Sequence, residues 1–248
     1  MAKNGRRETL DQLREEVASL RREVDQLVQV TKRTSTILVE QTIPTDDIDE
    51  MTKRAWTRSR PTPELTWNAV MDGEEFVEKM RGYSGGDLGR ILEIGPGYGR
   101  LLESILKNKI GFNDYLGIDI SAETVAFLTT KFGNEHVSYR HDDFFNFDAP
   151  GQFDSIMSSA VFMHFYPSVE PAMRSCHALL APRGRLYFDV PVGDARYLDV
   201  ASEFYVRDYR DSQELMDFAS AVGYSECAVE EELGFAPGMN GWFVCATK

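Results

Sequence analysis

The chain of 248 residues has an ordinary globular composition, 42% hydrophobic and 27% charged, with a formal net charge of −13. No segment approaches the roughly 18 consecutive apolar residues of a membrane-spanning helix, and the acidic excess disfavours binding to phosphate backbones. Its three cysteines are scattered and form no CxxC pair, so neither a disulfide framework nor a zinc site is indicated. We therefore expect a cytoplasmic protein that binds neither membrane nor nucleic acid.

Residues 1–41 are expected to form a helical coiled-coil segment. Between Leu10 and Leu27 the apolar residues recur at alternating spacings of three and four, as in a heptad repeat. With Leu10 at position a, Val17 and Val24 also occupy a and leucines occupy d, a combination that favours parallel two-stranded coiled coils. The pattern predicts a homodimer through this N-terminal helix, and an amphipathic helix packed on its own domain is the alternative.

Residues 42–87 are expected to be a connector with a helical lid or cap. The sequences TIPTDDIDE and RSRPTPE carry the prolines and acidic residues of an irregular segment. Trp56, Arg58, Arg60 and Trp67 are candidates for a lid or for one wall of an acceptor site. The alternative is that the tryptophans only anchor the connector to the domain.

From about residue 88 onward, short apolar runs alternate with helical segments. Strands are expected at 89–94, 115–119, 137–141, 153–159, 184–190, 225–231 and 241–247, and helices at 100–109, 122–132, 168–181 and 211–222. This alternation predicts an α/β fold for residues 88–248, with a doubly wound, mostly parallel, seven-stranded sheet. Too few residues separate the last two runs for a crossover helix, so the last strand should be antiparallel. Ligands of such sheets bind at the carboxyl ends of the strands.

The stretch ILEIGPGYG, residues 91–99, lies at one of those strand ends. Gly95, Gly97 and Gly99 follow the first expected strand and precede a helix. Glycines in this position let a ligand approach backbone N–H groups at a helix N-terminus. A dinucleotide site would read G-x-G-x-x-G, but the sixth position here is Arg100, so the third glycine comes one residue early.

The pattern E-x-G-x-G-x-G, with Glu93 first, resembles the first motif of class I S-adenosylmethionine-dependent methyltransferases. Asp119 ends the second strand, where a carboxylate can accept both ribose hydroxyls, although this spacing fits NAD as well. Asp143 precedes Phe144, where the resemblance implies an acid that accepts from the adenine amino group. The later segments FDSIMSSAVFMHF and LLAPRGRLYFDV are also similar to those of the family. The resemblance covers about residues 88–248.

The resemblance implies S-adenosyl-L-methionine as the cofactor. The predicted cofactor-binding residues are Glu93, Gly95, Gly97, Tyr98, Gly99, Asp119, Ile120, Asp142, Asp143, Phe144 and Ser159. Glu93 interrupts an apolar run and needs a partner, which the amides of the glycine loop or the methionine end of the ligand can supply. Asp119 and Asp143 have the alternative role of helix caps, with Ser121 competing for the cap after Asp119. Either Asp142 or Asp143 is expected to contact adenine, because Asp142 stands where the family commonly has glycine.

A sulfonium methyl group is already activated, so the protein has to hold the acceptor in line with it and exclude water. A hydroxyl acceptor must also lose a proton, and His164, just beyond the fourth strand, is the candidate general base. The alternative is that His164 is a packing residue among aromatic neighbours. Asp189 closes the fifth strand and Asp194 follows shortly, but no tight carboxylate cluster is visible, so we expect no metal.

The acceptor is expected to be a small molecule in contact with Trp67, His164 and Tyr166. The segments RSRPTPELTW and SSAVFMHFYPSVEPAM resemble bacterial methyltransferases associated with glycan and polyketide-sugar modification. That resemblance implies O-methylation of a sugar hydroxyl. Two alternatives remain: N-methylation of a small molecule or protein, and a dimeric coiled-coil scaffold with a vestigial ligand site.

Overall fold

The structure is a computed structural model that describes residues 45–58, 73–199, 204–236 and 239–248. The coiled coil predicted for residues 1–41 lies outside these ranges, as do Arg60 and Trp67. The described part of residues 42–87 contains two helices.

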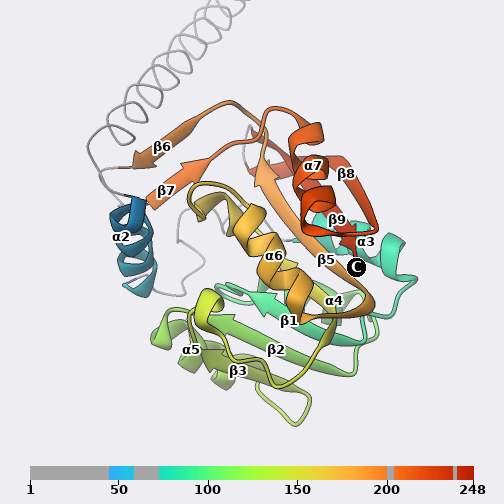
Figure 1. The fold of residues 1–248 in the computed structure, drawn as a ribbon. Coiled ribbons are helices and arrows are strands. Elements are labelled where there is room, and N and C mark those ends of the chain that lie inside the picture. The colour runs from blue at the N-terminus through green and yellow to red at the C-terminus, as the bar shows by residue number, and fades with distance from the viewer. Residues whose placement is uncertain (1–44, 59–72, 200–203, 237–238) are drawn as a thin grey trace, which may run out of the picture.

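Seven strands form one sheet in the order β3-β2-β1-β4-β5-β9-β8 (Figure 1). Five of them are parallel: β1 (Arg90–Ile94), β2 (Asp114–Asp119), β3 (Val137–His141), β4 (Phe153–Ser158) and β5 (Leu180–Pro191). Strand β9 (Met239–Thr247) runs antiparallel both to β5 and to β8 (Glu226–Ala236). The doubly wound sheet with an antiparallel last strand is therefore confirmed. Its order reverses between β1 and β4, which is the point where such sheets bind ligands.

Four helices form close to their expected positions. They are α4 (Arg100–Lys107), α5 (Ala122–Phe132), α6 (Glu170–Leu179) and α7 (Ser212–Val222). Two short 3-10 helices, η1 (Phe144–Asn146) and η2 (Phe162–His164), follow β3 and β4. Strand β5 begins at Leu180, earlier than expected, because Leu180 already pairs with Phe153 of β4.

Alternate residues of each central strand supply two separate hydrophobic cores, one on each face of the sheet. Leu92 and Ile94 of β1 belong to the core that contains Met173 of α6 and Leu215 of α7. Ile91 belongs to the other core, with buried residues of α3 and α4. Glu93 shares that second face, which places a carboxyl group beneath α4.

The segment expected to be a connector contains α2 (Thr45–Thr57) and α3 (Glu74–Ser84). Helix α3 buries Phe76, Val77 and Met80 in the second core, so it covers the sheet and is not a lid. Helix α2 buries Ile48, Thr52 and Ala55, spaced three or four residues apart. This apolar stripe is short and lies among acidic residues, which is why the sequence suggested an irregular segment.

A two-stranded antiparallel ribbon, β6 (Arg196–Asp199) and β7 (Phe204–Arg207), precedes α7 and was not predicted. It packs beside α2, where the Tyr205 backbone N–H donates to Thr52 Oγ1 at 3.2 Å. Figure 1 shows α2 and the ribbon together at one side of the body. Among the described helices, none has the length and hydrophobicity that crossing a bilayer requires.

Candidate functional site

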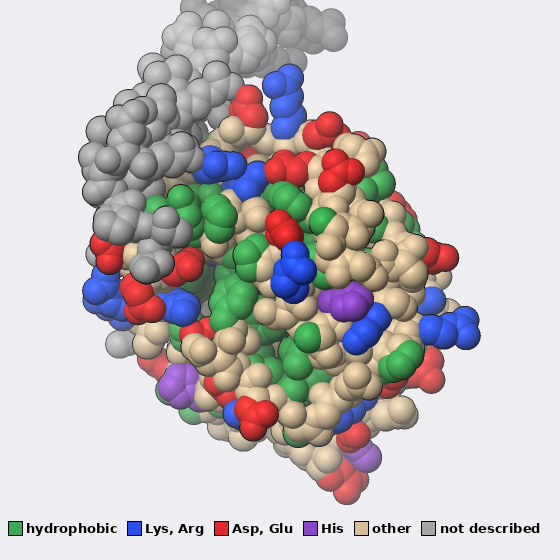
Figure 2. Space-filling view, in the orientation of Figure 1, with side chains coloured by type: hydrophobic (Ala, Val, Ile, Leu, Met, Phe, Trp, Pro, Cys, Tyr) green, Lys and Arg blue, Asp and Glu red, His purple; other side chains and the backbone are tan. Residues whose placement is uncertain are grey.

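A cavity opens at the carboxyl ends of β1, β2 and β4, beside the point where the strand order reverses. Of the predicted cofactor residues, those lining it are Gly95, Gly97, Tyr98, Asp119, Ile120, Asp142, Asp143, Phe144 and Ser159. Figure 2 shows hydrophobic side chains gathered in a hollow beside α2, with basic and acidic side chains interspersed over the surrounding face. One cavity thus brings together residues from four separate segments of the chain.

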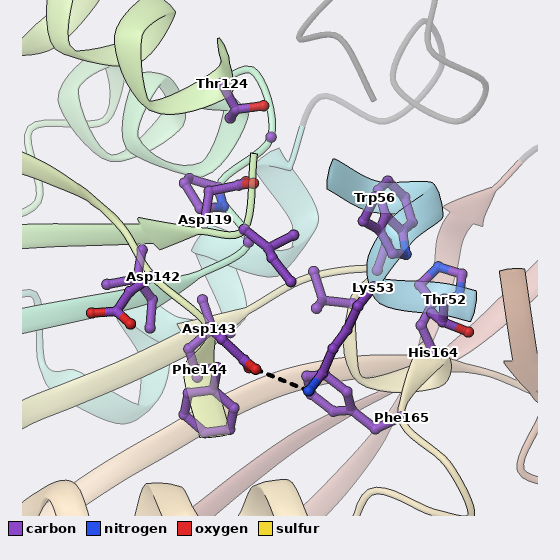
Figure 3. A pocket seen from close by; sticks show the side chains of 18 of the residues that line it. Thr52, Lys53, Trp56, Asp119, Thr124, Asp142, Asp143, Phe144, His164 and Phe165 are labelled. Carbon is purple, nitrogen blue, oxygen red and sulfur yellow. Dashed lines mark ion pairs between the residues drawn. The ribbon is translucent and has the colours of Figure 1, made fainter. Parts of the chain in front are cut away.

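Helix α2 forms the opposite wall of this cavity. Asp49, Thr52, Lys53 and Trp56 line it, and the Lys53 ammonium lies 2.9 Å from Asp143 Oδ2 (Figure 3). The Trp56 ring stacks on Phe204 of β7 with centroids 4.3 Å apart. Trp56 therefore lines the cavity and is also anchored by the ribbon, and its role as an acceptor wall stays a prediction.

The three glycines of the loop have three different surroundings. A Cβ on Gly97 would meet nothing within 4 Å, and its φ of +58° is one that L side chains rarely adopt. A Cβ on Gly95 would instead meet Val161, and one on Gly99 would lie 2.5 Å from the Phe132 ring of α5. Gly97 alone of the three leaves bare backbone facing open space. Gly99 does not line the cavity, and its missing side chain allows α4 to pack against α5.

Glu93 has a different partner from those expected. The Tyr115 hydroxyl donates a hydrogen bond to Glu93 Oε2, and both side chains are buried. Burial raises the pKa of Glu93 to about 7, although the Tyr115 hydrogen bond and the Arg100 charge act in the opposite direction. Glu93 is not among the residues that line the cavity. Tyr115 is thus the partner of Glu93 in the structure in place of the glycine-loop amides, and contact with the methionine end of a ligand stays a prediction.

Asp119 ends β2 at the cavity wall. Its Oδ1 accepts from the Ser121 backbone N–H at 2.8 Å, and Ser121 itself caps α5 by accepting from Thr124 N–H. Burial raises the pKa of Asp119 to about 6, while backbone hydrogen bonds from Ser121 and Gly97 lower it. Because Ser121 is the helix cap, the Asp119 carboxylate keeps acceptor capacity for a ligand.

The two adjacent aspartates after β3 have different partners. Asp142 pairs with Arg140 at 2.6 Å. Asp143 caps η1 by accepting from Phe145 N–H at 3.1 Å, and it also pairs with Lys53. The cap role proposed as the alternative for Asp143 is therefore present, and both aspartates border the cavity.

His164 lines the cavity but is only 5% exposed. Its Nδ1 lies 2.6 Å from the Tyr205 carbonyl oxygen, so Nδ1 carries the proton and donates, which leaves Nε2 as the acceptor nitrogen. Burial lowers the pKa of His164 to about 4. A neutral imidazole of this kind is a weak base. Tyr166 packs edge-on against Tyr205 and does not line the cavity, contrary to the substrate contact expected of it.

Arg100, Ser159 and Asp189 form a buried polar cluster at the cavity wall. Arg100 Nη2 donates to Ser159 Oγ at 2.5 Å, and Ser159 Oγ donates to Asp189 Oδ2. Asp189 is fully buried. Within the described residues no group of His, Cys, Asp or Glu is arranged to hold a metal ion, and Asp189 accepts protein hydrogen bonds instead.

Comparison with known proteins agrees with this arrangement. Residues 92–188 match the model of a family described as a methyltransferase domain. This chain carries a class I S-adenosylmethionine-dependent methyltransferase domain. It is 31% identical over 121 residues to an arsenite methyltransferase of Aquipseudomonas alcaligenes, a match over 44% of this chain and 35% of the relative. The match thus spans about a third of the relative's length.

Two solved structures resemble the methyltransferase domain in fold. The 1,6-didemethyltoxoflavin-N1-methyltransferase of Burkholderia thailandensis, with S-adenosylhomocysteine bound, has a TM-score of 0.69 at 18% identity, covering 83% of this chain and 90% of that chain. The N-methyltransferase NodS of Bradyrhizobium japonicum, in complex with S-adenosylhomocysteine, has a TM-score of 0.56 at 15% identity, covering 82% of this chain and 99% of that chain. The shared fold includes the sheet that forms the cavity.

Several residues that line the cavity were not identified from the sequence. They are Asp49, Thr52, Lys53, Ile94, Pro96, Arg100, Ile118, Thr124, Phe145, Ala160, Val161 and Phe165. Most of them are sequence neighbours of a predicted residue, so they reach the cavity together with it once the loops are placed. The α2 residues carry no such signal, because only the fold brings them to the cavity.

Proposed function

We propose that the methyltransferase domain binds S-adenosyl-L-methionine in this cavity and transfers its methyl group to a small-molecule acceptor. The observation that carries the proposal is Gly97, whose backbone is bare toward open space beside the Asp119 carboxylate. A nucleoside cofactor with a charged sulfur requires close backbone contact and a carboxylate for its ribose. The residues present therefore fit this group.

Each half of the cofactor has proposed partners in the cavity. Asp119 would accept the ribose hydroxyls, with Ile120 beside it, and Asp142 or Asp143 would accept from the adenine amino group beside Phe144. Gly95, Gly97 and Tyr98 would hold the methionine end against the glycine loop, which precedes α4. Bound there, the cofactor would supply an activated methyl group, and the chain's own residues would exclude water and orient the acceptor.

The acceptor side of the cavity is proposed to lie between Trp56, His164 and Ser159. We propose a hydroxyl of a sugar or glycan-type molecule as the acceptor, since an aromatic face such as that of Trp56 can stack on a sugar ring. The His164 Nε2 would accept a hydrogen bond from the acceptor. The role of His164 as general base stays a prediction, and its low pKa makes it a weak base for a hydroxyl proton.

A nitrogen acceptor is the second candidate. A neutral nitrogen already presents a lone pair, so it attacks without prior loss of a proton and places less demand on a base as weak as His164. Two of the solved structures that resemble the domain, those described above, are N-methyltransferases. This similarity supports nitrogen as the alternative without selecting a substrate.

Isothermal titration calorimetry tests the cofactor. We expect S-adenosylhomocysteine to bind and NAD not to bind, and the reverse would refute the proposal. Transfer of a labelled methyl group to a panel of sugars, phenols, amines and histones then separates enzyme from scaffold. Binding without transfer to any acceptor of the panel would favour the vestigial site.

The N-terminal segment has a test of its own. We propose that it forms the dimer, in a cytoplasmic protein. Deletion of residues 1–40 should convert dimers into monomers in light scattering and leave binding of S-adenosylhomocysteine unchanged. An unchanged mass would show that this segment is not the dimer element.

A further inference from the structure

We propose that Ser159 and Asp189 form a proton relay that takes the proton of the methyl acceptor. This inference rests on the proposed methyl transfer and concerns the same cavity. Ser159 faces the cavity at the end of β4, and Asp189 lies behind it near the end of β5. Ser159 would contact the acceptor, and Asp189 would act through Ser159.

The hydrogen bonds that Ser159 makes leave one lone pair of its hydroxyl oxygen without a donor. Its single proton is donated to Asp189, and one lone pair accepts from Arg100 Nη2 at 2.5 Å. A hydroxyl oxygen has two lone pairs, so one remains for an O–H or N–H donor. Since Ser159 lines the cavity, a molecule bound there can supply that donor.

Asp189 is held by both of its carboxyl oxygens. Oδ2 accepts from Ser159, and Oδ1 accepts from the Ala160 backbone N–H at 2.5 Å. Ala160 has a φ of +59°, an uncommon conformation for alanine that costs about 1–2 kcal/mol. This strained residue directs its N–H at Asp189, and such strain is concentrated at functional sites. The geometry fixes the aspartate in one orientation behind the serine.

The surroundings of the Ser159–Asp189 pair favour Asp189 as the group that accepts the proton. Burial raises the pKa of Asp189, while the Arg100 guanidinium lowers it and keeps the carboxylate form accessible. Glu232 is 4% exposed, and its Oε2 has no hydrogen-bond partner. Burial and the Asp189 charge raise the pKa of Glu232, so Glu232 favours its neutral form beside Asp189. Of these two acids, Asp189 is the one that accepts the Ser159 hydrogen bond and is placed to take its proton.

The proposed step is balanced in atoms and charge. The acceptor's lone pair forms the new bond to the methyl carbon, and the electron pair of the broken carbon–sulfur bond stays on sulfur. The acceptor's proton passes to Ser159 Oγ while the Ser159 proton passes to Asp189 Oδ2. Asp189 ends as a neutral acid beside Arg100, and it returns its proton to solvent after product release.

Infrared difference spectroscopy tests the pair without any acceptor. With 13C-labelled aspartate, the spectrum of wild type minus Asp189→Asn isolates the Asp189 carboxyl group. We expect a carboxylate at pH 8 that becomes an acid with a midpoint above the ordinary aspartate pKa of about 3.9. Ser159→Ala should raise that midpoint, because it removes a donor to the charged form. An acid band that persists at pH 9, or a midpoint that Ser159→Ala does not move, would overturn the relay.

Single-turnover methyl transfer to glucose, phenol and imidazole tests the chemistry. Asp189→Asn should bind S-adenosylhomocysteine within about threefold of wild type, yet transfer the methyl group about 100-fold more slowly, as for loss of a general base. Ser159→Ala should be slowed to a similar extent when the cofactor is saturating, so that a change in cofactor affinity does not enter the rate. Ser159→Thr, which keeps the hydroxyl, should restore most of the rate. A normal solvent deuterium isotope effect should be present in wild type and absent in Asp189→Asn.

The matched control is Ser158→Ala, which removes the neighbouring buried hydroxyl that donates to the Ile94 carbonyl oxygen. It should transfer at the wild-type rate. Transfer by Asp189→Asn at the wild-type rate, with its isotope effect intact, would refute the relay alone. Failure of wild type to bind S-adenosylhomocysteine would instead refute the proposed function. If wild type methylates none of the three probes, the relay is judged by the infrared titration of Asp189 and its response to Ser159→Ala.

Discussion

Lys53 of α2 and Asp143 of the loop after β3 form an ion pair across the cavity, with Nζ 2.9 Å from Oδ2. The pair connects the N-terminal part of the described chain to the strand ends that bear the proposed adenine contact. Trp56, three residues further along α2, reaches His164 with ring centroids 5.0 Å apart. Helix α2 is therefore fastened at both the proposed cofactor side and the proposed acceptor side.

Removal of this ion pair should loosen α2. Lys53 and Asp143 are each about one quarter to one third exposed, and such pairs contribute up to about 1 kcal/mol. We predict that Lys53→Met speeds amide hydrogen exchange in Thr45–Thr57 by about two- to fivefold. Arg54→Met, on the exposed side of the same helix, is the control. Equal exchange in the two variants would show that the ion pair does not hold α2.

Gly97 and Gly99 should respond differently to substitution by alanine. Gly97→Ala places a methyl group in the open cavity, so S-adenosylhomocysteine should bind at least about tenfold more weakly, with a stability loss of about 1–2 kcal/mol from the left-handed backbone. Gly99→Ala adds a clash with Phe132 and should destabilise by about a further 1–3 kcal/mol. Calorimetry and urea unfolding measure the two effects. A Gly97→Ala variant that binds normally would contradict the proposed ligand position.

The affinity for S-adenosylhomocysteine should depend on pH through Asp119. Burial raises its pKa to about 6, and only the carboxylate accepts two ribose hydroxyls. The dissociation constant should therefore rise below about pH 6, approaching tenfold per pH unit, and stay constant above it. Asp119→Asn should bind about 10- to 100-fold more weakly at pH 7.5 and lose this dependence. His141 also acts on Asp119, so His141→Gln is the control and should keep the dependence. If Asp119→Asn showed the same pH profile as wild type, the assignment of Asp119 as the ribose contact would be contradicted.

Glu93 should affect stability more than ligand binding. Its pKa is raised in the folded state to about 7. The stability that protonated Glu93 contributes is therefore fully present below its pKa in the unfolded chain, and it is lost as the pH rises through 7. Glu93→Gln should raise the free energy of unfolding at pH 8 by about 1–3 kcal/mol and change it little at pH 4. Urea unfolding at both pH values measures this. Binding of S-adenosylhomocysteine should change less than threefold, and a loss above tenfold would instead support Glu93 as a ligand contact.

The sheet could be predicted because each strand is a short apolar run with its own local boundary. The run ILEI ends at Gly95, and YLGID ends at Asp119, so both the strands and the ligand-binding edge follow from local sequence. Gly97 and Asp119 then meet because parallel strands end at the same edge.

The remaining parts depend on contacts between distant segments. Helix α2 is held by Thr52 against Tyr205, which is 153 residues away, and no local pattern signals that pairing. The role of Asp189 could not be predicted, because the sequence does not show that Ser159 and Ala160 donate to it. Gly99 belongs to the same motif as Gly97, yet only the position of Phe132 shows that its role is packing.

A crystal structure of the chain with S-adenosylhomocysteine tests the central claim most directly. The account predicts that both ribose hydroxyls lie within hydrogen-bond distance of the Asp119 carboxylate and that the methionine end crosses the backbone of Gly97. A nucleoside bound elsewhere, or Asp119 turned into solvent with the space beside Gly97 filled by side chains, would contradict it.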